Sequence, residues 1–166
     1  MIAVSNTSPL MALSKIGYVV YLGELFERVC IPEGVELELS KKDDEVWHAT
    51  KKLIEEGFVE VKTVKNVSLV RVLNLELGIG ESEAIALSIE IKTDFVLLDD
   101  LEARLYARSS GLSVTGTLGI IKALLRRGIV EETPKEIYVK LKSVDFWITK
   151  DLFSKIFLET REGGLV

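Results

Sequence analysis

The sequence predicts an α/β domain in which a parallel sheet of five strands has helices on both faces. Short apolar runs of strand character alternate along the chain with longer segments whose apolar residues have helical spacing. The run "FVLL" is apolar throughout, which is typical of a strand covered on both faces. Because 166 residues with 48% hydrophobic content can bury one substantial core, we expect a single domain over residues 1–166.

The first part of the chain predicts three strands with helices between them. "MIAVS" is the first strand, and Ser8 with Pro9 favours an immediate turn into a helix that breaks at Gly17. "RVCI" and "FVEVKTV" are the next strands. Between them, Pro32 opens and Gly57 closes a helical segment that we expect to be hinged near residues 40–43.

The second part continues the alternation. "VSLVRVLNLELG" predicts a helix ending at Gly78, and "GESEAIALSIEIK" predicts the next one. The strand "DFVLLDD" leads into the helix "LEARLYARSSG", and the short strand "LSVTGT" leads into the helix "LGIIKALLRRG". From about residue 134 the pattern indicates a helical C-terminal extension, with a loose tail at Gly163 and Gly164.

Composition narrows the classes of function. The sequence has 21 Lys and Arg against 26 Asp and Glu, and its pI is about 5.1. This acidic balance argues against a protein that binds duplex DNA through a broad basic face. The same composition is compatible with a nuclease that binds divalent cations through carboxylates. The sequence contains no run of about 18 apolar residues, the length needed to span a bilayer, so we expect no membrane contact. With no signal-peptide pattern at the start and Cys30 as the single cysteine, we expect a cytoplasmic protein without a disulfide.

Acidic and amide side chains occur at four places, either directly after a predicted strand or in a predicted helix. These are Asn6, Glu38, the pair Glu81 and Glu83, and the pair Asp99 and Asp100. Taken singly, each could be a helix cap or a solvated charge. Taken together, they converge on the carboxyl edge of a parallel sheet, where such carboxylates repel one another unless a cation lies between them. Oxygen ligands suit Mg²⁺ or Mn²⁺ rather than zinc, and we expect His48 to be a surface residue.

The chain resembles the PIN-domain ribonucleases, specifically the VapC-like toxin branch found in prokaryotes. The stretches that carry the resemblance are "VSNTSPLMALSKIG", "CIPEGVELEL", "LGIGESEAIALSIE", "VLLDDLEARLYARSSGLSVTGTLGIIKAL" and "GIV", over about the first 130 residues. The resemblance implies a three-layer α/β/α fold with strand order 3-2-1-4-5 and metal-dependent endoribonuclease activity on single-stranded RNA. It also implies homodimerisation and inhibition by a small antitoxin protein encoded alongside.

The family's site residues can be carried onto this sequence one by one. Its four acidic positions fall, in chain order, on Asn6, Glu38, Glu83 and Asp100. Ser8 takes a supporting hydroxyl position, and Glu81 is a nearby helper. Glu36 is the alternative alignment for the second position, and Asp99 is the alternative for the fourth. The departure is Asn6, where members of the family usually have aspartate.

Basic residues in two helices are candidates for contact with RNA. They are Arg104 and Arg108, which share a helix face, and Lys122, Arg126 and Arg127. A solvated basic face is the alternative interpretation. For the protein as a whole, the neutral side chain at Asn6 supports a second hypothesis, a catalytically weak PIN-like module that binds RNA or a protein without cleavage. Because we expect Cys30 to be buried, homodimerisation should use apolar helix faces.

Overall fold

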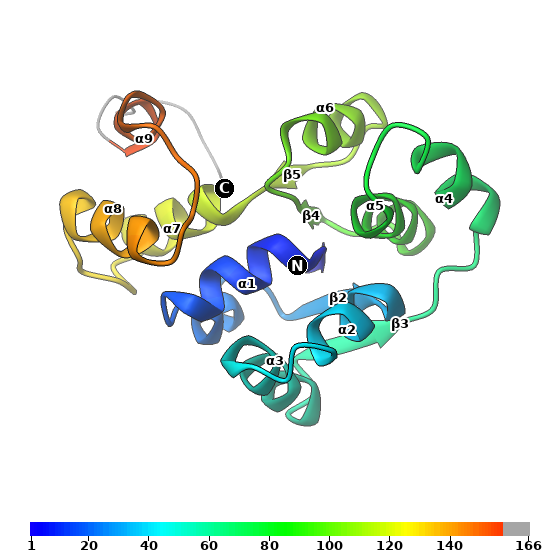
Figure 1. Ribbon diagram of the computed structural model, residues 1–166, viewed down its shortest axis with the longest axis horizontal. Helices are drawn as coiled ribbons and strands as arrows, with labels where there is room; N and C mark the ends of the chain where they lie inside the picture. Colours follow the sequence, from blue (N-terminus) through cyan, green and yellow to red (C-terminus); the bar gives the residue numbers. More distant parts are fainter. Residues whose placement is uncertain (158–166) are drawn as a thin grey trace.

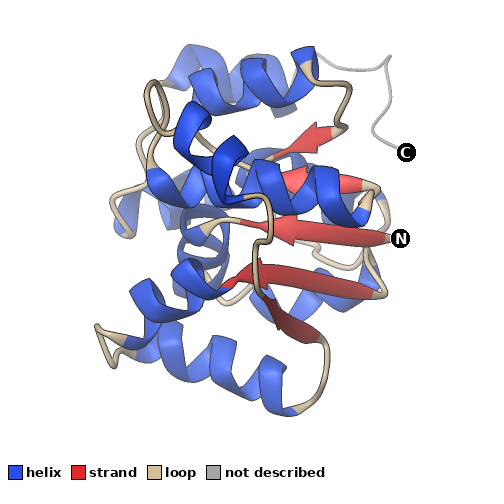
Figure 2. Cartoon of the chain, turned by 90° about the vertical axis from the view of Figure 1, so that its right-hand side faces the viewer, coloured by secondary structure: helices blue, strands red, loops and turns tan. Residues whose placement is uncertain are grey.

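The computed structural model describes residues 1–157 and contains a parallel five-stranded sheet. The strand order is β3-β2-β1-β4-β5, and the central strand β1 pairs with β2 on one side and β4 on the other. All pairings between neighbouring strands are parallel, and the strands run in one direction in Figure 2. The strands are β1 (Ile2–Ser5), β2 (Arg28–Pro32), β3 (Val59–Lys62), β4 (Phe95–Leu97) and β5 (Val114–Thr115). The predicted fold class and strand order are therefore confirmed.

Helices connect successive strands and cover both faces of the sheet (Figure 1). They are α1 (Thr7–Lys15), the 3₁₀ helix η1 (Val19–Glu24), α2 (Glu33–Ser40), α3 (Glu45–Glu55), α4 (Val67–Leu73), α5 (Ile79–Ile91), α6 (Leu101–Ser109), α7 (Thr117–Arg126), α8 (Pro134–Ser143) and α9 (Lys150–Phe157). One core lies between the sheet and α1, η1, α3 and α7, and the other lies between the sheet and α4, α5 and α6. None of these helices is long and apolar enough to cross a membrane.

Successive side chains along a strand belong alternately to the two cores. Ala3 of β1 and Leu97 of β4 belong to the core under α1 and α7. Val4 and Val96 belong to the core under α5, because successive strand residues point to opposite faces. At the ends of these strands, the same alternation directs polar side chains toward different helices.

Glycines end the helices largely where the sequence predicts. Gly17 and Gly111 have φ of 78° and 80°, the left-handed conformation that residues with a Cβ rarely adopt, so the helices before them stop there. One boundary differs from the prediction, since α4 ends at Leu73 rather than continuing toward Gly78. Leu75 supplies helical periodicity in the sequence, but its side chain is 84% exposed in the turn that follows α4.

The C-terminal helices α8 and α9 pack onto the first core. Ile137, Leu141 and Phe153 are buried in it. Tyr18, next to η1, donates a hydrogen bond to Glu132, and Lys140 of α8 forms an ion pair with the same carboxylate. The predicted extension from about residue 134 thus shares the core of the preceding chain. The tail predicted at Gly163 and Gly164 lies outside the described residues.

Candidate active site

Asn6 is the residue around which the site is built. It directly follows β1 and is 2% exposed, and its extended backbone (φ −86°, ψ −174°) precedes the first turn of α1. Its side chain makes no capping hydrogen bond to α1. Instead, Nδ2 donates to Oε1 of Glu81 on α5 at 3.2 Å, while Oδ1 is buried without a hydrogen-bond partner. The side chain of Asn6 therefore does not serve as the helix cap.

Thr7 connects the same strand end to α2. Its hydroxyl donates to Oε2 of Glu38 at 2.6 Å, and the Thr7 side chain is buried. The sequence predicted Ser8 as the supporting hydroxyl, but Ser8 is exposed in the first turn of α1. Glu36 lies two residues from Glu38, which places it on a different side of α2. The structure thus brings Glu38 to the end of β1 through a hydroxyl that the sequence analysis did not select.

Glu83 projects from α5 toward the first turn of α2. Gly34 leaves the space for it, because a Cβ built on Gly34 would lie 2.1 Å from Oε2 of Glu83. That Oε2 atom is buried and has no hydrogen-bond partner. Burial raises the pKa of the Glu83 carboxyl above its usual value, and the nearby charge of Glu33 raises it further. Glu83 is therefore held in an enclosed position that penalises its charge.

Asp99 and Asp100 follow β4 and have different environments. Asp99 accepts two hydrogen bonds of 2.7 Å, from the backbone N–H and the hydroxyl of Thr117 at the start of α7. Burial raises the pKa of Asp99 despite these bonds and the positive charge of Arg104. Asp100 is exposed and caps α6 by accepting from the N–H of Ala103 at 2.8 Å. Of the two, Asp99 lies deeper at the sheet edge.

The oxygen atoms at this edge fit a hard divalent cation in kind. Among the residues that the structure describes, no three Asp, Glu, His or Cys side chains meet closely enough to form a ready metal centre. Two buried acceptors, Asn6 Oδ1 and Glu83 Oε2, nevertheless lack a donor, which is costly unless a ligand satisfies them. Amide and carboxylate oxygens are ligands for Mg²⁺ or Mn²⁺, whereas His48 lies exposed on α3.

The basic residues predicted to contact RNA differ in burial and in their hydrogen-bond partners. Arg104, on α6, is half-buried with an unpartnered Nε, and burial together with the charge of Arg108 lowers its pKa. Arg108 is exposed one turn further on. In α7 and at its end, Lys122 is partly buried, Arg126 is exposed, and Arg127 donates to the backbone oxygen of Glu24 at 2.7 Å. Arg127 therefore fastens the end of α7 to η1.

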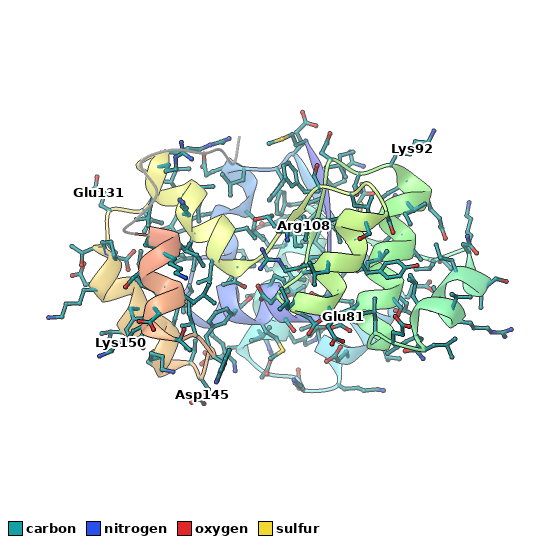
Figure 3. All side chains as sticks on the ribbon, turned by 90° about the horizontal axis from the view of Figure 1, so that it is seen from above. Glu81, Lys92, Arg108, Glu131, Asp145 and Lys150 are labelled. Atoms are coloured by element: carbon teal, nitrogen blue, oxygen red, sulfur yellow. The ribbon has the colours of Figure 1, made fainter. Side chains whose placement is uncertain are left out.

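Figure 3 shows Glu81 and Lys92 at opposite ends of α5, and the hydrogen bond from Asn6 places Glu81 at the edge where β1 ends. This edge also receives Glu38, Glu83 and Asp99 through the contacts described above. These side chains come from four segments that lie at the carboxyl end of the sheet, namely the end of β1, α2, α5 and the end of β4. Thr7, Thr117 and Gly34 are the contributors that sequence reasoning missed.

Comparison with known proteins agrees with this geometry. A family model described as a PIN domain matches residues 2–162. A comparison with curated proteins finds no match to this sequence. Proteins with PIN domains are generally nucleases. Because the matched region covers almost the whole sequence, the chain belongs to the PIN-domain family.

Proposed function

We propose that this protein is a metal-dependent endoribonuclease that cleaves single-stranded RNA. The observation that carries the proposal is the pair of buried oxygen atoms, Asn6 Oδ1 and Glu83 Oε2, that lack any hydrogen-bond donor. A divalent cation would supply the missing positive partner for both. This arrangement at the carboxyl edge of a PIN-domain sheet supports a site for phosphodiester hydrolysis.

Glu83 and Asn6 would hold the cation, with Glu38 and Asp99 or Asp100 as further oxygen ligands. The chemistry that a bound Mg²⁺ or Mn²⁺ supplies is acidification of a water molecule and stabilisation of charge on the phosphodiester. Thr7 orients the Glu38 carboxylate, and Thr117 fixes both oxygens of Asp99. These residues keep the acidic side chains in place for attack on a phosphodiester.

Arg104 and Arg108 are the side chains that we propose for binding the RNA backbone near this edge. Arg104 is a half-buried cation whose Nε has no partner, so a phosphate oxygen could accept its hydrogen bond. Lys122 and Arg126 on α7 would extend the contact. Arg127 is a weaker candidate, because its guanidinium already bonds the Glu24 backbone oxygen.

The test is cleavage of end-labelled single-stranded RNA with Mn²⁺ or Mg²⁺, and in EDTA. Cleavage should require the cation and should be lost in Glu83→Gln and reduced in Asp100→Asn. Glu102→Gln is the matched control, since Glu102 is exposed in the first turn of α6. Absence of cleavage across many RNAs, with intact metal binding, would favour the second candidate, a PIN-like module that binds RNA or a protein. The neutral side chain at Asn6 is the observation that favours this second candidate.

We also propose that the protein is a cytoplasmic toxin that forms a homodimer and is held inactive by a small antitoxin. Leu101 and Leu105 are 65% and 53% exposed and lie one turn apart on α6, so they offer an apolar helix face for self-association. Cys30 is buried, which argues against a disulfide-linked dimer. Light scattering tests the dimer, and mass spectrometry of proteins that co-purify with the chain tests the antitoxin.

A further inference from the structure

Asn6 and Glu81 form a hydrogen-bonded pair across 75 residues of sequence. The amide Nδ2 faces the carboxylate, because the opposite orientation would place two acceptor oxygens against each other. The planar amide then directs Oδ1 away from Oε1 of Glu81. At 2% exposure, Asn6 leaves this Oδ1 atom buried with no donor. The Nδ2 end of the amide is therefore satisfied within the pair, and the Oδ1 end is buried without a hydrogen-bond partner.

Glu81 is held on its other side by a close approach to the backbone. Its Oε2 lies over Gly78, where a Cβ would come within 2.3 Å of it. Glu81 belongs to the first turn of α5, a common place for an acid that only stabilises a helix start. The side-chain hydrogen bond that it accepts, however, comes from Asn6 at the end of the central strand. The Glu81 carboxylate thus lies between the Asn6 amide and Gly78.

We propose that Asn6 and Glu81 act as one ligand pair for the cation, an inference that rests on the proposed function. Asn6 Oδ1 is a neutral ligand atom, and Glu81 supplies the negative charge that the amide lacks. Hard cations are held by carboxylate charge as well as by the number of oxygens, so the pair is a better ligand than the amide alone. Asn6 also positions Glu81 through the Nδ2 hydrogen bond.

The pair also explains how an amide can be favourable at position 6. A carboxylate there would face the Glu81 carboxylate at the 3.2 Å that now separates Nδ2 from Oε1. Two such charges repel one another unless a cation lies between them. Asn6 replaces this repulsion by a hydrogen bond from its amide to the Glu81 carboxylate.

A double-mutant cycle tests the pair with wild type, Asn6→Asp, Glu81→Gln and the double variant. Mn²⁺ affinity is measured by calorimetry, and melting temperature is measured in EDTA. Glu81→Gln should weaken Mn²⁺ binding by about tenfold or more, as loss of a ligand or its supporting partner commonly does. Asn6→Asp should tighten binding and should bring the Glu81→Gln protein back near the wild-type affinity.

In EDTA, Asn6→Asp should lower the melting temperature of the wild-type background and leave that of the Glu81→Gln background unchanged. Glu102→Gln, which also removes one charge from a first helical turn, should leave Mn²⁺ affinity unchanged. If Glu81→Gln does not fold, Gly78→Ala displaces the same carboxylate and takes its place in the cycle. The proposal is overturned if Glu81→Gln binds Mn²⁺ like wild type, or if Asn6→Asp has equal effects in both backgrounds.

Neither measurement requires RNA. Coupling between positions 6 and 81 without RNA cleavage would support the pair and reject the proposed nuclease function. Mn²⁺-dependent cleavage without that coupling would support the nuclease function and reject the pair.

Discussion

Gly34→Ala is the substitution that most directly tests the position of Glu83. Gly34 is the second residue of α2, and its new Cβ would lie 2.1 Å from Oε2 and 2.9 Å from Cδ of Glu83. Carbon and oxygen cannot approach so closely, so one of the two must move. The Glu83 carboxylate is the far end of a flexible side chain, and we expect it to move while the backbone of α2 stays in place.

Gly34→Ala should therefore raise the stability of the protein while it weakens the binding of Mn²⁺. Alanine in place of glycine within a helix stabilises by up to about 1 kcal/mol. In a domain of this length, that gain corresponds to a melting temperature up to roughly 2–4 °C higher in EDTA. Displacing a ligand should weaken Mn²⁺ binding by about tenfold or more. RNA cleavage should fall with it.

Gly80→Ala is the matched control, because Gly80 is the second residue of α5 and a Cβ there meets nothing within 4 Å. It should show the same gain in helix stability with unchanged Mn²⁺ affinity. Calorimetric titration and thermal denaturation of both variants make the comparison. Wild-type Mn²⁺ affinity in Gly34→Ala would refute the placement of Glu83 in the site, and global unfolding of that variant would refute the expectation that the Glu83 side chain moves aside.

Three further predictions concern the supports of the site. Thr117→Val removes one of the two bonds to Asp99 and should lower the free energy of unfolding by about 1.5–3 kcal/mol, measured in urea. The pKa values of Glu83 and Asp99 are raised, so these acids ionise first in the unfolded chain, and stability in EDTA should fall as pH rises through their raised values. The melting temperature of Glu83→Gln should therefore exceed that of wild type more at pH 7.5 than at pH 4, and a constant difference would contradict this. Arg104→Gln should weaken single-stranded RNA binding and lower its salt slope by about 0.7, measured by fluorescence anisotropy. Equal effects of Arg104→Gln and Arg126→Gln would argue against a specific role for Arg104.

The fold was predictable because each element has a local signal in the sequence. Short apolar runs mark the strands, and glycines such as Gly17 and Gly111 end helices with positive φ. The end of α4 was not predictable, because Leu75 has helical spacing although its side chain lies in solvent. Periodicity reports the apolar character of a residue, and only the tertiary structure decides which apolar residues are buried.

The sequence indicates which acidic side chains to consider for the candidate site, but it does not indicate the residues that hydrogen-bond to them or leave space for them. Residue types at strand ends and in the neighbouring helices indicate Asn6, Glu38 and Glu83, since a parallel sheet brings the ends of its strands and the starts of the adjoining helices to one edge. Whether Thr7 or Ser8 faces inward depends on where β1 ends and α1 begins, and a shift of one residue reverses the answer. Gly34 is informative only once α5 is packed beside α2.

The position of β1 in the middle of the sheet explains why its end organises the site. Helices α5 and α2 each present a carboxylate to this strand end, and two consecutive residues receive them, Asn6 for Glu81 and Thr7 for Glu38. The neighbouring strand β4 leads to Asp99, which accepts its hydrogen bonds from Thr117 of α7, on the side of the sheet to which Leu97 points. The acidic side chains are thus tied separately to different elements, in accord with the absence of a ready metal cluster within residues 1–157. A substitution at Asn6 should therefore affect Glu81 more than it affects Asp99. In double-mutant cycles of Mn²⁺ affinity, the coupling energy between positions 6 and 81 should exceed that between positions 6 and 99.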